Sequence, residues 1–243
     1  MTETIVANTT ARLIARSTLT EADLAGMHQL LSHHFDGVTR GQFEADLMEK
    51  NWVILIERGD EVVGFTTILT YETTFSGGPV SVVYSGDTIV SPSAWNSSSL
   101  PRAWIESVAS LRKLHPRGPY VWLLITSGFR TYRFLPVFWR EFFPRYDMPT
   151  PAHWKAMMDH IAMERFGSQY DPQSGIVRLK NPQRLAESLA VVPQGRLDDP
   201  HIAFFTARNP GHADGDELVC LADLSPVQLT PAGQRMAAAT PQW

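Results

Sequence analysis

A run of small polar residues followed by an arginine is the part of the chain best suited to hold an anion. Ser97, Ser98 and Ser99 precede a stretch with helical periodicity, and Arg102 falls in its first turn. The first N–H groups of a helix have no intrahelical partner, and small residues let an anion approach them. The run therefore indicates a phosphate site at a helix start, or else a simple serine cap.

Two acidic residues stand near the ends of apolar stretches, where a carboxylate can face a cleft. Asp87 lies late in the stretch 80–90, and Glu72 follows the stretch 62–71. A carboxylate in such a place can accept a proton from a substrate as a general base. The alternative for each is a capping or solvent-facing role.

The last third of the chain contains the single cysteine, Cys220, shortly after His212, Asp214 and Asp216 in the stretch ARNPGHADGDELVC. These residue types can form a nucleophile system with a thiol attacking group. A lone cysteine in an apolar stretch is more often a small buried residue. The Asn-Pro-Gly and Asp-Gly pairs predict a hairpin loop before Cys220.

The composition is that of an ordinary globular protein. The chain has 243 residues, 44% hydrophobic and 19% charged, with a net charge of −4. Without a basic excess, nucleic acid is not expected as a partner. No apolar run is long enough to span a bilayer, and residues 1–10 lack the pattern of a signal peptide. We therefore expect a cytoplasmic protein with no membrane partner.

A metal site is not expected from the ligand types present. One cysteine rules out a cysteine-only metal site as well as an intrachain disulfide. His33 and His34 are adjacent in a helical stretch, so their side chains point about 100° apart and chelate one ion poorly.

Hydrophobic periodicity predicts an α/β chain. Apolar runs predict strands at 11–17, 52–57, 62–71, 80–90, 120–125, 176–179, 202–207 and 217–221. Helical spacing predicts helices at 20–34, 39–50, 98–114, 132–142 with a break at Pro136, 154–166 and 183–189. The stretch 80–90 is apolar on both alternating faces, so helices should cover its sheet on both sides.

Prolines divide the chain into two regions. All 17 lie at Pro79 or later, and 11 lie at Pro144 or later. Because proline interrupts helices and strands, the last hundred residues should consist of shorter elements. We expect a first domain over 1–149 and an α+β extension over 150–243, as a lid or substrate element.

Residues 11–145 resemble the GCN5-related N-acetyltransferase (GNAT) family. The predicted order is strand, helix, helix, three antiparallel strands, helix, strand, helix. ARLIARSTLTEADLAGMHQLL is similar to the family's opening strand and helix, and FEADLMEKNWVILIERGDEVVGFTTI to its second helix and strand pair. GDTIVSPSAW is similar to the end of its central strand. The resemblance implies a mixed, largely antiparallel sheet flanked by helices.

The resemblance also implies a binding loop for acetyl-CoA or another acyl-CoA as co-substrate. The family's Arg/Gln-x-x-Gly-x-Gly/Ala loop aligns with residues 95–100, where Trp95 replaces the Arg/Gln and Ser98 and Leu100 replace the small residues. The strand before this loop is implied to meet the pantetheine arm. The implied cofactor-binding residues are Thr88, Ile89, Val90, Asn96, Ser97, Ser98, Ser99 and Arg102.

The resemblance also implies three catalytic residues. Asp87 or Glu72 would accept the proton of an attacking amine, and Tyr132 would protonate the leaving thiolate. The stretch around Tyr132, FRTYRFLPVFWREFFP, departs from the family pattern. Its aromatic rings can instead pack in the core, line an apolar tunnel or cover a homodimer contact.

The first functional hypothesis is an enzyme that transfers an acyl group from acyl-CoA to the amine of a small molecule. The amine would attack the thioester directly, with a main-chain N–H of the central strand holding the oxyanion. The second is a GNAT-like scaffold that has lost acyl transfer and binds a ligand or partner, or runs another reaction in the same cleft. The third is a thiol enzyme that uses Cys220.

Overall fold

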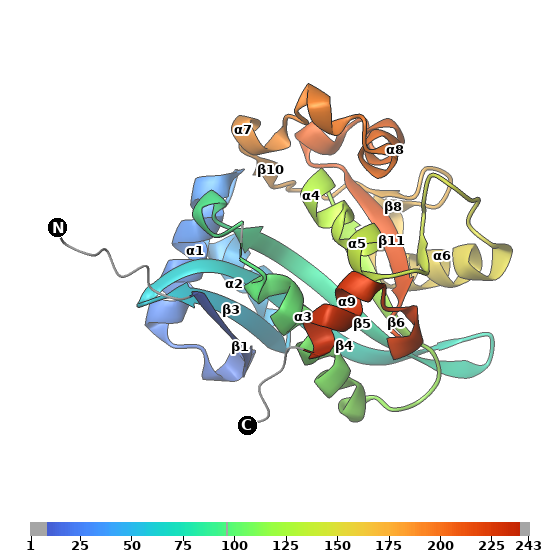
Figure 1. Cartoon of the computed structure of the whole chain (residues 1–243), viewed down its shortest axis with the longest axis horizontal. Coiled ribbons are helices and arrows are strands. Elements are labelled where there is room, and N and C mark those ends of the chain that lie inside the picture. Colours follow the sequence, from blue (N-terminus) through green and yellow to red (C-terminus); the bar gives the residue numbers. More distant parts are fainter. Residues whose placement is uncertain (1–8, 96, 239–243) are drawn as a thin grey trace.

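The computed structural model describes residues 9–95 and 97–238 (Figure 1). The helices are α1 (Glu21–His34), α2 (Arg40–Met48), α3 (Ser99–Leu111), α4 (Phe129–Tyr132), α5 (Phe134–Phe138), α6 (Ala152–Phe166), α7 (Glu187–Ala190), α8 (Pro200–Arg208) and α9 (Pro231–Ala238). The strands are β1 (Thr9–Ala15), β2 (Phe35–Asp36), β3 (Trp52–Arg58), β4 (Glu61–Phe75), β5 (Gly78–Val90), β6 (Tyr120–Thr126), β7 (Phe142–Phe143), β8 (Tyr170–Asp171), β9 (Ile176–Val177), β10 (Arg184–Leu185) and β11 (Glu217–Asp223).

A nine-stranded sheet organises the molecule. Its strand order is β1-β3-β4-β5-β6-β11-β9-β8, with β7 paired to β11. The pairs from β1 to β5 are antiparallel, β5 and β6 run parallel, and β11 runs antiparallel to β6. The predicted mixed, largely antiparallel sheet flanked by helices is therefore confirmed.

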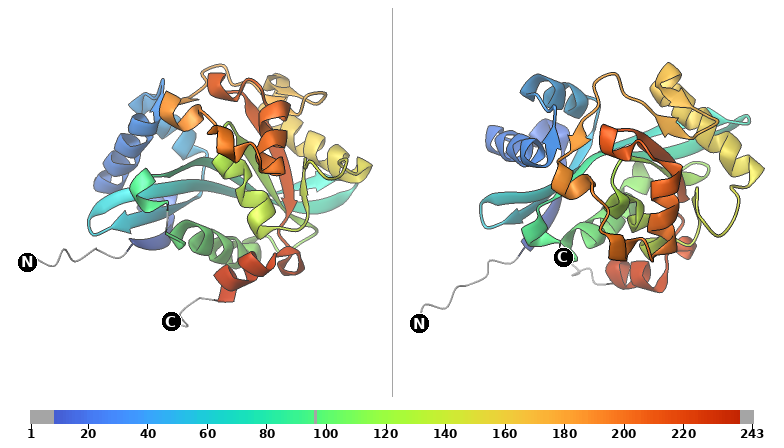
Figure 2. Two further views of the ribbon diagram at one scale, coloured as in Figure 1. Left: turned by 45° about the horizontal axis from the view of Figure 1, so that its top comes forward. Right: turned by 90° about the horizontal axis from the view of Figure 1, so that it is seen from above.

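Helices cover both faces of this sheet, as the two views of Figure 2 show. On one face α1 and α2 pack Met27, Leu31 and Phe43 against β3 and β4, and α6 packs farther along on β5 and β6. On the other face α3 packs Trp104 against Trp122 of β6. This double covering explains why β5 is apolar on both faces.

The start of α1 follows from local chemistry. The Oγ1 of Thr20 accepts a hydrogen bond from the N–H of Asp23 at 3.1 Å, and the carboxylate of Asp23 accepts one from the N–H of Thr20 at 2.8 Å. These reciprocal bonds satisfy two N–H groups at the helix start and contribute about 1 kcal/mol to stability. The predicted helix at 20–34 is confirmed.

Residues beyond 149 complete the same sheet. β11 pairs with β6 from Leu218 opposite Thr126 to Asp223 opposite Val121. Cys220 of β11 is fully buried in the cluster that includes Trp122 of β6. The boundary between 1–149 and 150–243 stays a prediction, and the two regions share one core.

The predicted strand at 202–207 is wrong, because this segment lies in helix α8. Asp199 caps the helix by accepting a hydrogen bond from the N–H of His201 at 3.0 Å, and Pro200 occupies its first turn. Ile202 and Phe205, three residues apart, are both fully buried. A short apolar run is compatible with the two-residue period of a strand and with the 3.6-residue period of a helix. Here the Asp199 cap and Pro200 favour the helix. The segment before β11 is therefore a helix-to-strand connection and not a hairpin loop.

The segment at 183–189 also differs from the predicted helix, since it contains β10 and then α7. β10 pairs with β2, with Leu185 opposite Phe35. This pairing brings the C-terminal region against the end of α1.

None of the helices in the described part of the chain is both long and apolar enough to cross a membrane.

Candidate functional site

The two parallel strands at the centre of the sheet separate at their carboxyl ends. β5 pairs with β6 only from Ser81 opposite Tyr120 to Ser85 opposite Leu124. Beyond Ser85, β5 continues along β4, whereas β6 continues along β11. An opening between strands therefore begins at Gly86, and its two edges carry main-chain groups without a neighbouring strand.

An irregularity in β5 lies where the strands separate. Thr66 of β4 is opposite Thr88, but Ile68 is opposite Ser85, so Gly86 and Asp87 together face the single residue Thr67. Such a bulge bends a strand and re-aims its side chains. A Cβ on Gly86 would lie 2.6 Å from the Oγ1 of Thr67, so this position excludes larger residues.

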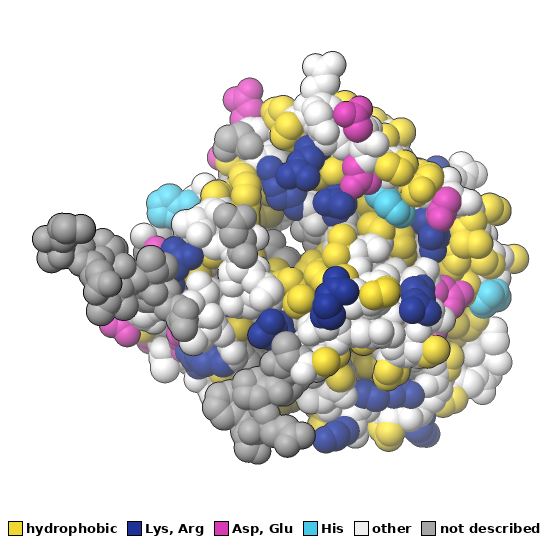
Figure 3. Space-filling model, viewed as in Figure 1, with side chains coloured by type: hydrophobic (Ala, Val, Ile, Leu, Met, Phe, Trp, Pro, Cys, Tyr) yellow, Lys and Arg dark blue, Asp and Glu magenta, His cyan; other side chains and the backbone are white. Residues whose placement is uncertain are grey.

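A pocket of about 510 Å³ occupies the opening. Its walls come from the end of β5, the start of α3, the β6–α4 connection, β10, α7 and α8. In the space-filling view, Lys and Arg side chains surround a hollow on this face (Figure 3). The described lining residues include three arginines, Arg130, Arg133 and Arg196, and no Asp or Glu. The pocket is therefore suited to a ligand with an apolar part and an anionic part.

The edge of β5 presents main-chain groups to this pocket. Ser91 donates to the carbonyl of Val63 of β4 at 2.8 Å. Because antiparallel residues alternate between bonded and non-bonded pairs, Thr88 and Val90 direct their N–H and C=O groups away from β4, toward the opening. The contact between Thr88 Oγ1 and Thr66 Oγ1 at 2.7 Å agrees with a closely spaced, non-bonded pair.

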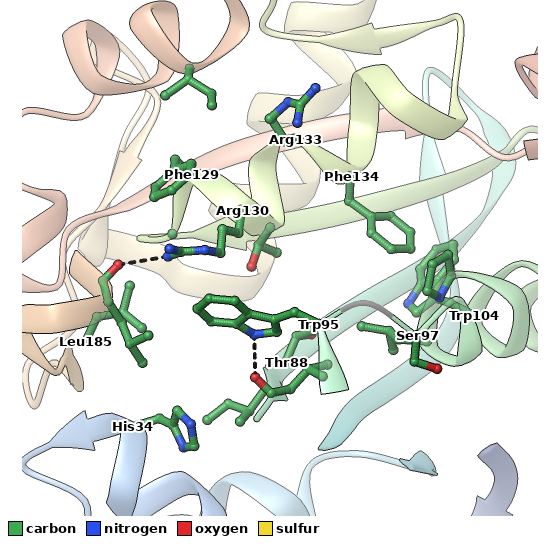
Figure 4. Close-up of a pocket in the computed structure, with 18 of the residues that line it drawn as sticks. His34, Thr88, Trp95, Ser97, Trp104, Phe129, Arg130, Arg133, Phe134 and Leu185 are labelled. Carbon is green, nitrogen blue, oxygen red and sulfur yellow. Dashed lines mark hydrogen bonds between the residues drawn. The ribbon is translucent and has the colours of Figure 1, made fainter. Parts of the chain in front are cut away.

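A stacked arrangement of side chains lies over this edge (Figure 4). The indole Nε1 of Trp95 donates to the carbonyl of Val90 at 2.8 Å. The guanidinium of Arg130 lies between two rings, 4.4 Å from the centre of Trp95 and 4.5 Å from that of Phe129. It also donates to the carbonyl of Leu189 at 3.2 Å. Cation–π contacts on both sides thus hold the Arg130 charge at the pocket wall.

Two carboxylates flank the opening from the face that carries α6. Asp87 lies in the bulge next to Thr88, and Glu217 begins β11 and hydrogen-bonds to Ser127, next to Gly128. Both Thr88 and Gly128 line the pocket. Burial raises the pKa of Asp87 to about 6. Burial, and secondly the charge of Asp87, raise the pKa of Glu217 to about 8.

Lys50 supplies the positive charge beside this pair. It is 7% exposed, its Nζ donates to the carbonyl of Asp46 at 2.9 Å, and it lies 5.4 Å from the centre of the Tyr84 ring. Burial lowers the pKa of Lys50, and the charge of Asp87 opposes that effect. Asp87 thus meets opposing influences, since burial raises its pKa and the charge of Lys50 lowers it, and its pKa of about 6 lies below that of Glu217 at about 8. Such a separation of pKa values is typical of acid–base pairs.

The predicted cofactor-binding residues divide into two groups. Thr88, Ile89, Val90 and Ser97 line the pocket. Among the described residues, Ser98, Ser99 and Arg102 are not part of its lining. Asn96 lies outside the described residues.

The serine run uses its polar groups internally. Ser99 donates its N–H to the Oγ of Ser97 at 3.1 Å, and its hydroxyl donates to the carbonyl of Thr9 at 3.2 Å. Pro101 has no N–H, and the N–H of Arg102 donates to the carbonyl of Ser98. The start of α3 therefore has few donors left for a ligand, and its role in phosphate binding stays a prediction.

Two of the three predicted catalytic residues, Glu72 and Tyr132, are not in the pocket lining, and their catalytic roles stay predictions. Glu72 is opposite Ser81 at the other end of β5 and pairs with Arg117. At about 3.3 Å per residue, this is roughly 23 Å from Thr88. Tyr132 is fully buried, and its hydroxyl donates to the carbonyl of Pro144 at 3.0 Å. Asp87 is the predicted catalytic residue that the structure places at the opening.

The thiol hypothesis is contradicted by burial. Cys220 is fully buried, its Sγ lies 3.9 Å from the carbonyl of Leu218, and burial raises the pKa of the thiol. A thiol in such surroundings stays protonated and inert.

In the described part of the chain, no three His, Cys, Asp or Glu side chains are grouped as metal ligands would be.

The aromatic stretch after Tyr132 belongs to the core. Phe138, Trp139, Phe142 and Phe143 are each at most 8% exposed. Trp139 stacks in a cluster whose members Trp104, Trp122 and Phe134 form one wall of the pocket. A homodimer through this stretch is not supported by its burial, and the oligomeric state stays open to test.

Sequence reasoning missed Glu217, Lys50 and Arg130. Glu217 is an acidic residue at the start of an apolar stretch, and Asp87 was identified by its place near the other end of such a stretch. Lys50 lies two residues before β3 and has no comparable sequence signal. Arg130 stands in an aromatic stretch whose residue types indicate a core segment, so no sequence signal marks it as a pocket residue.

The order of elements from β1 to α5 agrees with the order on which the resemblance to the GNAT family was based. No protein-family model and no curated protein matches the chain. Solved structures similar to it include a probable N-acyltransferase of unknown function from Enterococcus faecalis, with a TM-score of 0.43, 14% identity, and coverage of 55% of this chain and 33% of that chain. The chain thus spans about a third of that protein.

Two Escherichia coli structures are also similar. The GNAT family N-acetyltransferase YhbS, solved in complex with CoA, has a TM-score of 0.38 and 15% identity, covering 52% of this chain and 68% of that chain. ElaA has a TM-score of 0.38 and 16% identity, covering 53% of this chain and 85% of that chain.

Proposed function

We propose that the chain is an acyl-CoA-dependent N-acyltransferase that acts on the amine of a small molecule. The observation that carries this proposal is the opening between β5 and β6. There a free main-chain edge and an arginine-lined pocket lie on one side, and a carboxylate pair lies on the other. A two-substrate transfer needs these three features at one place.

The residues of the pocket fit an acyl-CoA. An extended chain with amide groups can pair with the main-chain groups of Thr88 and Val90 as an added strand would. Apolar walls at Trp104, Trp122 and Phe134 suit the uncharged arm. The arginines suit a ligand that carries phosphates. Bound there, the acyl-CoA supplies an acyl group activated as a thioester.

The carboxylates suit the acceptor side of the reaction. The nitrogen of a neutral amine forms a bond to the acyl carbon, the bond from that carbon to sulfur breaks, and the products are an amide and a free thiol. The amine loses one proton, which the ionised carboxylate of Asp87 can accept. Glu217, whose pKa is raised by burial, can supply a proton to the leaving thiolate. One main-chain N–H on the free edge of β5 would hold the negative charge that develops on the carbonyl oxygen.

An assay of thiol release from acetyl-CoA, run with a panel of small amines, tests the proposal. We expect turnover with at least one amine, and a loss of about a hundredfold or more in Asp87→Asn. Glu72→Gln is the matched control, because Glu72 is a carboxylate on the neighbouring strand β4, opposite the far end of β5. Loss of activity in the control to the same extent would contradict the assignment of Asp87.

A binding scaffold without acyl transfer is the second candidate. It is favoured by the bond from Trp95 to Val90 and by the internal bonding of the serine run. Thermal unfolding with acetyl-CoA separates the two. At about 100 times its dissociation constant, a ligand adds about 2.7 kcal/mol, or roughly 5–10 °C for a chain of this size. The absence of any shift would make the scaffold the better description.

A further inference from the structure

The start of α3 offers few free donors to the phosphates of an acyl-CoA. The hydroxyls of Ser97 and Ser99 contact each other at 2.6 Å, and the N–H of Ser99 is bonded to Ser97. Pro101 brings no donor. The pocket nevertheless has a strongly cationic wall, formed by residues on the opposite side of the opening.

Arg130 is the central residue of this wall. The rings of Trp95 and Phe129 hold its guanidinium from both sides, as Figure 4 shows, and one of its five N–H groups donates to Leu189. The remaining donors face a pocket whose described lining contains no carboxylate. A guanidinium fixed in this way loses little entropy when it binds an anion.

A second guanidinium reinforces the first. Arg196 lines the same pocket, and its charge, after burial, is the further cause that lowers the pKa of Arg130. Like charges close together without an acid between them are unfavourable unless an anion joins them. Arg133 differs, because Asp199 lies 2.8 Å from its Nε and balances its charge.

We infer that Arg130 and Arg196 form the phosphate-binding site of this pocket and take the role that the serine run was expected to have. This inference rests on the proposed function, in which the ligand is an acyl-CoA. The site would bind the pyrophosphate or another multiply charged phosphate group by bidentate hydrogen bonds. Trp95 then acts as a positioning residue, because it orients Arg130 and does not itself carry charge.

Binding measurements on three variants test the inference. The dissociation constant for acetyl-CoA is measured by calorimetry at two salt concentrations for wild type, Arg130→Gln and Arg196→Gln. Losing a charge-assisted hydrogen bond should weaken binding about tenfold to a hundredfold and reduce its salt dependence. Arg40→Gln is the matched control, since Arg40 lies on α2 and pairs with Glu44 outside the pocket.

A thioester without phosphates separates a binding role from a structural one. With S-acetyl-pantetheine as acyl donor, kcat/KM should be the same in wild type and Arg130→Gln. With acetyl-CoA it should fall in the variant by the same factor as the affinity. An equal fall with both donors would overturn the inference, because Arg130 would then be shaping the pocket and not binding phosphate.

The remaining outcomes distinguish the inference from the function on which it rests. Unchanged affinity for acetyl-CoA in both arginine variants would overturn the inference and leave the proposed function standing. If acetyl-CoA does not bind wild type but inorganic pyrophosphate stabilises it, and Arg130→Gln removes that effect, the anion site stands and the proposed function fails. If neither ligand binds wild type, both fail.

Discussion

The indole Nε1 of Trp95 donates a hydrogen bond to the main-chain carbonyl of Val90 at 2.8 Å. Val90 lies on the edge of β5 that faces the opening, so the indole occupies the place where an extended ligand would present its own N–H. The guanidinium of Arg130 lies over the face of the same ring, 4.4 Å from its centre. Trp95 therefore links the strand edge of the pocket to its cationic wall.

Replacing Trp95 with Phe keeps a ring beside Arg130 and removes the donor. We expect the free energy of unfolding to fall by about 1 kcal/mol, measured by urea denaturation, because one hydrogen bond is lost. Affinity for acetyl-CoA should rise about three- to tenfold, because the ligand no longer competes with the indole for the Val90 carbonyl. Weaker binding would show that the indole N–H itself contacts the ligand.

The dependence of acyl transfer on pH should report the ionisation of Asp87. The base must be unprotonated and Glu217 must keep its proton, so kcat/KM should fall above the pKa of about 8 and, on the acid side, should rise along a limb with a pKa of about 6. Because Asp87 and Glu217 interact, the profile gives values for the pair. In Asp87→Asn the limb along which kcat/KM rises at a pH of about 6 should disappear. A limb that persists unchanged in the variant would assign the base elsewhere.

The stability of the protein should fall with rising pH through the range in which the carboxylates ionise. Asp87 has its folded pKa raised from 3.8 to about 6, so between these values the folded state binds more protons than the unfolded chain. The free energy of unfolding therefore decreases as pH rises through this window, and Glu217 extends the decrease to about pH 8.

Removing either charge tests this pH dependence. Asp87→Asn and Glu217→Gln should each be more stable than wild type at pH 8, by about 1–3 kcal/mol, and the difference should vanish near pH 4. Urea denaturation at pH 4, 6 and 8 measures it. A variant less stable than wild type at pH 8 would mean that the charged carboxylate is stabilised by its neighbours, Lys50 above all.

Cys220 should be dispensable for activity. Its side chain is fully buried in β11, and burial raises the pKa of its thiol. Cys220→Ala should retain full acyl transfer, and native protein should resist alkylation by iodoacetamide. A loss of about 1 kcal/mol in stability is expected from the small cavity. Inactivation of the native enzyme by alkylation would restore the thiol hypothesis.

The order of elements up to residue 126 could be predicted from the sequence because local signals agree there. The capping box of Thr20 and Asp23 defines the start of α1, and the long apolar stretches define β3 to β6. The C-terminal region was harder to predict. The run at 202–207 is too short for its period to be decisive, and the Asp199 cap with Pro200 made it a helix.

The candidate site was only partly predictable for a different reason. Thr88, Ile89, Val90 and Asp87 belong to one strand, so sequence order already places them together. Glu217 reaches the same opening only because β11 inserts beside β6, far along the chain from β5. Arg130 becomes a pocket residue because the rings of Trp95 and Phe129 hold it.

The sequence by itself therefore determined the strand that carries the site, the helices that cover it and one of its two carboxylates. The tertiary structure alone decided where β5 and β6 separate, which carboxylate faces Asp87 and which arginines line the pocket. The physical reason is the distance along the chain over which each interaction acts. Caps and hydrophobic periods act over a few residues, whereas burial and charge coupling depend on which distant segments pack together.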